Sequence, residues 1–260
     1  GGRRESWGRI GMAVTGADVQ DIFKIPELIR RILFTLALLG VYRVGVHIPT
    51  PGVDGDSLAA FFAQHQNTIF GIFDMFSGGA LERLSVFALG IMPYISASII
   101  IQLLTVVIPH LEQLKKEGEQ GKKKITQYTR YGTVALSLIQ GFGISIGLEN
   151  MTSPGNAPIV IEPGWSFRLM TMITLTAGTA FIMWLGEQIS ERGIGNGISL
   201  IIVAGIVARL PVAIGNTFRM MTTGEMGVFC FFILSILMLG VVAFIIFMEM
   251  GQPRIPVPYA

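Results

Sequence analysis

Long stretches without charged side chains recur along this sequence and set the scale of its secondary structure. One of them runs from Leu84 to Ile108, 25 residues without a charge and with a proline, Pro93, inside. An α-helix rises about 1.5 Å per residue, so roughly 20 apolar residues cross the hydrocarbon core of a bilayer. This stretch is therefore long enough to span a membrane.

Six stretches have the length of a span. They cover residues 32–48, 84–108, about 131–148, about 169–185, about 198–214 and 227–248. In lipid every backbone N–H and C=O must be paired within the chain, which over such lengths requires a helix. Strands of a membrane barrel would be about half as long and would alternate in polarity. The pattern predicts an all-α protein, a polytopic bundle of six transmembrane helices.

The composition agrees with a membrane protein. Mean hydropathy is +0.62 and 14% of the residues are charged, against about 25% in a soluble domain. The one cysteine, Cys230, lies in the sixth stretch, so an internal disulfide is excluded. Water cannot be the solvent for most of this surface.

Lysine and arginine predict the orientation of the bundle. With the N-terminus in the cytoplasm, the inner side holds Lys24, Arg30, Arg31, Lys115, Lys116, Lys122, Lys123, Lys124, Arg130, Arg192 and Arg254. The outer connections then hold Arg83, Arg168, Arg209 and Arg219, all close to helix ends. Inner loops of membrane proteins carry an excess of Lys and Arg. Both ends of the chain are therefore predicted to face the cytoplasm.

The N-terminal residues precede the first span. Residues 1–17 are predicted to be a flexible leader, and 18–31 a cytoplasmic amphipathic helix lying in the headgroup layer, with Ile22 and Phe23 opposite Lys24. A simple juxtamembrane stop is the alternative for residues 18–31. No cleavable signal peptide is predicted, because the first apolar run is a full span.

The first outer connection, residues 49–83, becomes apolar a second time. Its opening prolines and glycine end the first helix. The piece at about 69–81 is too short to cross a bilayer and too apolar to lie in water. Broken backbone at membrane depth is tolerated where protein or a water-filled cavity surrounds it. The sequence thus favours a re-entrant half-helix inside a cavity; an apolar lid on the outer surface is the alternative.

Glycines mark two further local features. Gly90 and Pro93 are expected to kink the second span. The run GEQISERGIGNGIS superficially matches a nucleotide-binding glycine loop, but it follows a membrane helix rather than a strand. A tight cytoplasmic hairpin, with Asn196 capping the fifth span, is expected instead.

The interiors of the predicted spans lack reactive groups. Ion-coupled transporters need carboxylates or paired charges near the midplane, whereas Glu149, Glu187 and Glu249 fall at helix ends. Arg43 is the exception, and it is expected to snorkel or to pair with another subunit. No HExxH pair or catalytic pair is present. We therefore predict no catalytic, metal or cofactor site, and an apolar passage or scaffold remains.

Several long motifs resemble one family. They are RILFTLALLGVYRVGVHIPTPG (31–52), FDMFSGGALER (73–83), FALGIMPYISASIIIQLL (87–104), KKITQYTRYGT (123–133) and WLGEQISERGIGNGISLIIVAGIVA (184–208). They are similar to the SecY family, the large subunits of bacterial protein-conducting channels. Such proteins have ten spans in two inverted halves. Residues 32–214 resemble spans one to five, and residues 215–260 resemble span six and the start of the following cytoplasmic loop.

The resemblance implies roles for individual residues. A plug within 69–81 would contain Phe73, Asp74, Met75, Phe76, Ser77, Gly78 and Gly79. An apolar pore ring would contain Ile91, Ile95, Ile198 and Ile202, and a lateral gate Ser96 and Gln140. The two isoleucines of each span are spaced i, i+4 and so face one way. Spacing alone would equally fit lipid-facing or core positions.

The resemblance also implies a function and partners. The chain would belong to a non-enzymatic channel of the bacterial plasma membrane that translocates unfolded polypeptides and releases apolar segments into lipid. Implied partners are SecE-like and SecG-like subunits, a SecA-like motor ATPase, the ribosome, signal-sequence-bearing chains and membrane lipids. Half of a small-molecule secondary transporter and a non-conducting insertion scaffold are the alternatives.

Overall fold

The computed structural model describes residues 26–65, 71, 74, 77–152, 158–224 and 227–250. All regular secondary structure in these residues is helical, and in place of strands they contain three isolated bridges between connecting segments. The prediction of an all-α fold is confirmed. The chain divides into two compact units, residues 1–209 and 210–260, and each is described by itself.

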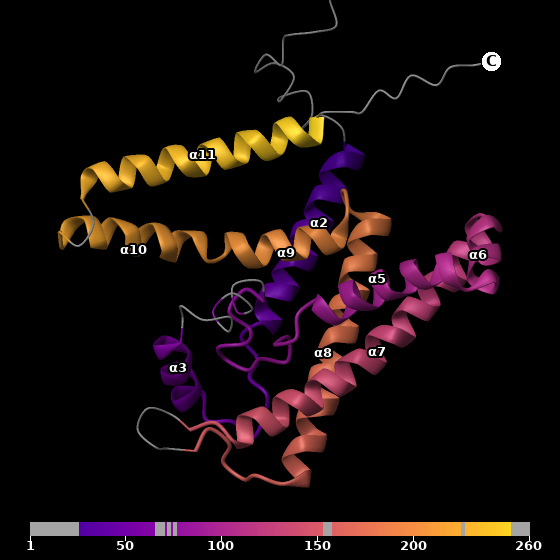
Figure 1. The fold of residues 1–260 in the computed structure, drawn as a ribbon, viewed down its shortest axis with the longest axis horizontal. Helices are drawn as coiled ribbons and strands as arrows, with labels where there is room; N and C mark the ends of the chain where they lie inside the picture. The colour runs from indigo at the N-terminus through magenta and orange to yellow at the C-terminus, as the bar shows by residue number, and fades with distance from the viewer. Residues whose placement is uncertain are drawn as a thin grey trace, which may run out of the picture. The chain divides into compact units, whose positions relative to one another are not determined.

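The first unit is built around one central helix, α8 (Figure 1). Its helices are α2 (Pro26–Gly45), α3 (Gly55–Gln64), α5 (Met92–Val107), α6 (Pro109–Lys116), α7 (Glu119–Glu149), α8 (Trp165–Arg192) and α9 (Gly197–Val207). α8 packs against α2, α5, α7 and α9. Its buried positions include Thr171, Leu175, Gly178, Ile182 and Leu185. Their spacing of three or four residues is that of one helix face, which the other helices cover.

The second unit consists of α10 (Leu210–Thr222) and α11 (Val228–Met250). Mean hydropathy reaches 3.0 over Phe229–Glu249, and none of this stretch is buried inside protein. A helix that is apolar all round needs lipid or another protein surface as its surroundings. α11 therefore has the properties of a membrane span.

Length and composition identify fewer spans than the six predicted. Among the described residues, four stretches qualify: Glu119–Glu149, Trp165–Arg192, Gly197–Thr222 and Phe229–Glu249. A fifth is obtained if α5 and α6, which meet at a bend of 100°, are counted as one. α2 is outside this set. Its 20 residues include Arg30, Arg31 and Arg43, which shorten its uninterrupted apolar length.

The second predicted span departs from the expectation of one kinked helix over residues 84–108. α5 begins only one residue before Pro93, at a position where the missing N–H of proline would have no helical partner in any case. Residues 84–91 form turns instead, with positive φ at Leu84 (39°) and Gly90 (58°). The prediction was wrong here because Pro93 starts a helix rather than bending one.

Connecting segments form a cap at one end of the first unit. Thr50 N donates to Leu84 O (2.8 Å), and Asp54 N donates to Ile159 O (2.9 Å). The cap encloses a group of buried apolar side chains: Leu58, Phe62, Leu84, Ala88, Leu148, Ile159, Val160, Phe167 and Leu175. This group packs α3 against the ends of α7 and α8.

The N-terminus of α3 supplies a test of this cap. The Asp54 carboxylate accepts the Ser57 hydroxyl (2.6 Å) and the Asp56 N–H (3.2 Å), and these bonds, Ser57 first, hold the pKa of Asp54 below its usual value. A carboxyl whose folded pKa is depressed stabilises the fold above its unfolded pKa of about 3.9, and this is lost as pH falls through the folded value. Hydrogen-exchange protection of α3 is therefore expected to decrease with acidification.

The matched control is Asp54→Asn, which retains an N-cap acceptor but does not titrate. After correction for intrinsic exchange rates, protection of α3 in this variant is expected to change little between about pH 5 and pH 3. Equal acid sensitivity in the parent and in Asp54→Asn would contradict the assignment.

Several predictions fall outside the described residues. These are the leader at 1–17, residues 18–25 of the amphipathic helix, Phe73, Met75 and Phe76 of the plug, and residues 251–260. The hairpin before α9 is described, and the Asn196 side chain accepts the N–H groups of Ile198 and Ser199. The predicted cap at Asn196 is confirmed.

Candidate functional site

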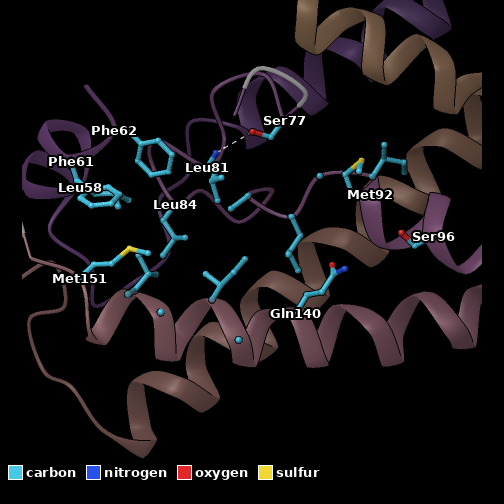
Figure 2. A pocket seen from close by; sticks show the side chains of 18 of the residues that line it. Leu58, Phe61, Phe62, Ser77, Leu81, Leu84, Met92, Ser96, Gln140 and Met151 are labelled. Atoms are coloured by element: carbon cyan, nitrogen blue, oxygen red, sulfur yellow. Dashed lines mark hydrogen bonds between the residues drawn. The ribbon is translucent and has the colours of Figure 1, made fainter. Parts of the chain in front are cut away.

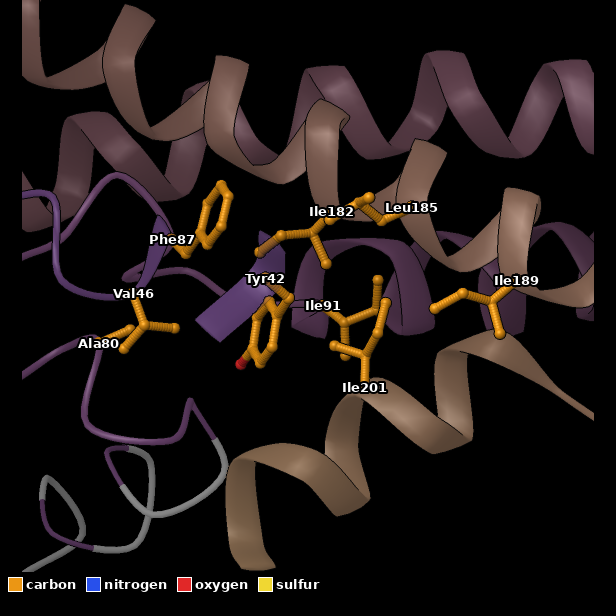
Figure 3. Close-up of a cluster of buried hydrophobic side chains, with 9 residues drawn as sticks. All are labelled: Tyr42, Val46, Ala80, Phe87, Ile91, Ile182, Leu185, Ile189 and Ile201. Atoms are coloured by element: carbon orange, nitrogen blue, oxygen red, sulfur yellow. The ribbon is translucent and has the colours of Figure 1, made fainter. Parts of the chain in front are cut away.

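Apolar side chains from three helices and the segment between α3 and α5 meet in one buried cluster (Figure 3). Its members are Tyr42, Val46, Ala80, Phe87, Ile91, Ile182, Leu185, Ile189 and Ile201. The rings of Tyr42 and Phe87 stack with centroids 5.9 Å apart. The cluster holds residues 80–91 between α2, α8 and α9, and this fixes where Ile91 lies.

The turns at residues 84–91 approach α8 closely at Gly178. A Cβ atom at this position would overlap the carbonyl oxygen of Val86. The Val86 N–H in turn donates to Ile48 O (2.9 Å), so the carbonyl belongs to backbone that is itself held. Glycine at residue 178 thus sets the distance between α8 and the segment that carries Ile91.

A cavity of about 700 Å³ adjoins this cluster (Figure 2). Its walls come from α3, the segment from Ser77 to Ile91, the first turns of α5, the second half of α7 and one residue of α9, Ile202. None of the described residues that line it is charged. An apolar constriction that water leaves readily is a barrier to ions.

The four predicted ring residues have related but unequal positions. Ile91 is buried in the cluster and also lines the cavity. Ile95 and Ile202 are half-buried, pack against the cluster and line the cavity. Ile198 packs against the cluster but is not among the lining residues. The structure therefore brings three of the four to one cavity: Ile91 just before α5, Ile95 within α5 and Ile202 from α9.

The two predicted gate residues both line this cavity and come from helices that pack against each other. Ser96 comes from α5 and Gln140 from α7 (Figure 2). With Ser77 they are the polar side chains among residues that are otherwise apolar or glycine. The wall between α5 and α7 therefore contains polar groups that an occupant could contact.

The described part of the predicted plug is tied into the first unit. Asp74, Ser77, Gly78 and Gly79 are all buried. Ser77 lines the cavity, and its hydroxyl oxygen accepts the Leu81 N–H (3.3 Å; Figure 2). The guanidinium of Arg43 donates to Gly78 O (2.9 Å). Arg43, which was expected to snorkel or to pair with another subunit, thus makes a bond within this chain.

Other charged side chains pair near the ends of the helices. Arg130 makes two bonds to Glu187 (2.8 and 2.7 Å) and joins α7 to α8. Arg168 does the same with Glu149 at the other end of these helices (2.9 and 2.6 Å). Within the described ranges, no three His, Cys, Asp or Glu residues come together as a metal site. These charges fix the helices and leave the cavity wall neutral.

Sequence reasoning missed one wall of the cavity. Leu58, Phe61 and Phe62 of α3 line it, although residues 49–83 were treated as a connection with a single apolar piece. The run SLAAFFAQ, preceded by Asp54 as N-cap, was the available signal. It was overlooked because α3 has only 10 residues, too few for the span criterion.

The fold and cavity together define a class of protein. Helices of spanning length, packed around a large uncharged cavity, are those of a multi-pass membrane protein. The chain belongs to the SecY family: the family model SecY matches residues 85–260.

Curated relatives support this assignment. The chain is 55% identical over 236 residues to protein translocase subunit SecY of Escherichia coli strain K12, covering 91% of this chain and 53% of that protein. It is 52% identical to the protein of the same name from Pseudomonas aeruginosa, covering 91% of this chain and 52% of that one. The chain thus spans about half the length of these relatives.

A solved structure shows the same fold. Sec61 in the canine ribosome-channel complex from the endoplasmic reticulum superposes with a TM-score of 0.58 at 17% identity. The match covers 88% of this chain and 49% of the Sec61 chain. At this identity the likeness concerns the arrangement of helices alone.

Proposed function

We propose that this chain forms part of a protein-conducting channel, which passes unfolded secretory polypeptides across the bacterial plasma membrane and releases apolar segments sideways into lipid. The observation that carries the proposal is the uncharged cavity of about 700 Å³ where Ile91, Ile95 and Ile202 meet. Membership of the SecY family supports it. The remaining ring positions are assigned to the part of the relatives that this chain does not cover.

The closed state follows from the chemistry of the wall. Branched apolar side chains leave a narrow waist dry, which blocks ions, and they can part around a moving peptide without breaking any polar bond. Segment 69–81 acts as a plug beside this waist. Ser96 and Gln140 lie at the lateral gate between α5 and α7, where a signal sequence leaves the channel.

The proposed channel performs no chemistry of its own. A SecA-like ATPase or a translating ribosome supplies the driving force, SecE-like and SecG-like subunits complete the complex, and the N-terminus faces the cytoplasm. The lysines at the junction of α6 and α7 agree with this orientation.

Ion conductance tests the proposal. In planar bilayers containing a full-length SecY-family protein that carries this chain, Ile202→Asn is expected to raise resting conductance on the order of tenfold. Lowering a dewetting barrier by about 1.4 kcal/mol gives this factor. Val203→Asn, at the neighbouring exposed position of α9, is the control and is expected to leave conductance at the parent level.

The alternatives give different results. A non-conducting insertion scaffold shows no conductance change in either variant. Half of a small-molecule transporter shows solute-dependent currents in the parent. Either outcome contradicts an apolar seal at Ile202.

A further inference from the structure

A buried carboxylate, that of Asp74, accepts a backbone hydrogen bond within the connection between α3 and α5. The Asp74 side chain is 4% exposed and accepts the Glu82 N–H (2.8 Å). The Asp74 carbonyl oxygen also accepts the Gly79 N–H and the Ser77 hydroxyl, both at 3.0 Å. Asp74 therefore accepts hydrogen bonds from three residues of the stretch 77–82, namely Ser77, Gly79 and Glu82.

Arg209, just after α9, neutralises this carboxylate. Its guanidinium donates to Asp74 and, at 3.0 Å, to Glu82. Glu82 is 34% exposed and is partly solvated, whereas Asp74 is not. A buried charge that loses its partner is strongly unfavourable, so the pair with Asp74 is the one that determines the position of the segment.

The same face of α9 accommodates the backbone of the segment. Ile201, Gly205 and Arg209 follow one another at intervals of four residues, so they lie on one side of the helix and its following turn. Ile201 belongs to the buried cluster. A Cβ at Gly78 would lie only 2.9 Å from the Cα of Gly205. The segment therefore rests directly on α9, with Arg209 one turn beyond the point of contact.

α2 holds the opposite side of the segment through neutral acceptors. The Tyr42 hydroxyl donates to Ser77 O (3.3 Å), and Arg43 donates to Gly78 O (2.9 Å). These bonds orient the turn, but they involve carbonyl groups that water could satisfy after displacement. The Asp74 carboxylate is different, because while it stays buried water cannot replace its bond to Arg209.

We propose that Arg209 is a positioning residue, which holds Asp74 and residues 77–82 against α2 and α9 by neutralising the buried Asp74 carboxylate. Loss of its charge drives the Asp74 carboxylate to water and moves the segment away from the cavity wall that Ser77 helps to form. The consequence for conduction rests on the proposed function; the position of the segment does not.

Thiol labelling measures the position of the segment directly. The parent is a full-length SecY-family protein carrying this chain with Cys230→Ser and Ser77→Cys, reacted with a water-soluble maleimide. Because Ser77 is buried, the parent thiol is expected to react slowly. Arg209→Gln is expected to increase the labelling rate on the order of tenfold or more. Arg83→Gln, which removes a nearby exposed arginine, is the control and is expected to have no effect.

A double variant separates positioning from general loss of packing. Replacing both members of a buried ion pair is far less harmful than removing one, so Asp74→Asn with Arg209→Gln is expected to return labelling to within about threefold of the parent rate. Because it contains no unpaired buried charge, this variant also provides a folded comparison if Arg209→Gln expresses poorly. Unchanged labelling in Arg209→Gln, or equally fast labelling in the double variant, would overturn the inference.

Conductance of the same proteins is the second readout. Faster labelling of Arg209→Gln together with a raised conductance supports both the inference and the channel. Faster labelling with unchanged conductance supports the role of Arg209 and contradicts the assignment of this segment as a plug. The failure of one proposal is thereby distinguished from the failure of the other.

Discussion

Gly178→Ala is expected to lower the free energy of unfolding on the order of 3 kcal/mol, despite the better helix propensity of alanine. The added methyl group would overlap the carbonyl oxygen of Val86. Neither side yields easily, because α8 packs against four other helices and the Val86 N–H is bonded to Ile48 O (2.9 Å). The measurement is the thermal midpoint in detergent, followed by size-exclusion chromatography after heating.

Gly40→Ala is the matched control. Gly40 is also inside a helix, α2, but a Cβ there has no atom within 4 Å. Its replacement is expected to be neutral or to stabilise the protein by up to about 1 kcal/mol through helix propensity alone. Similar thermal midpoints for Gly178→Ala and Gly40→Ala would show that the approach of Val86 to α8 is not close.

Features that depend on neighbouring residues could be predicted from the sequence. The lengths of the apolar runs predicted the all-α class, approximate limits for α8 and α11, and the C-terminal end of α7. Asn196 followed by an apolar run indicated the cap of α9, which the structure confirms. In these cases the physical cause, a helical period or an N-cap bond, lies within a few residues.

Features that depend on distant segments could not be predicted. Pro93 within an apolar run fits a kinked helix or a helix start equally well. The turns at residues 84–91 are held by contacts with α8 and by the bond from Val86 N to Ile48 O. The partner of Arg43, Gly78 O, is 35 residues away. The pairing of Arg209 with Asp74, 135 residues apart, likewise leaves no local signal.

In the candidate site, too, local features could be predicted and features that depend on distant segments could not. Helical spacing placed Ile91 and Ile95 together, and Ile198 and Ile202 together, but it could not say which surface each pair faces. Packing against α8 turns Ile198 toward Gly186, where a Cβ would approach it to 3.2 Å. Ile202, one turn on, lines the cavity instead. Helix-to-helix packing therefore decides which isoleucines meet an occupant.

The most direct test of the account asks whether a translocating chain touches these isoleucines. A photo-crosslinking amino acid is placed at Ile95 or Ile202 in the full-length protein, and a secretory polypeptide is stalled during transport. Val203 on α9 and Ile173 on α8, both more than half exposed, are the outward-facing controls. Irradiation followed by gel analysis measures the yield of adducts at each position.

We expect the adduct yield at Ile95 and Ile202 to exceed that at Val203 and Ile173 on the order of tenfold, since a polypeptide within the cavity contacts its wall and not the outer surface. Adducts at Val203 and Ile173 with none at Ile95 and Ile202 would contradict the account, because the stalled chain would then lie outside the hollow that these isoleucines line.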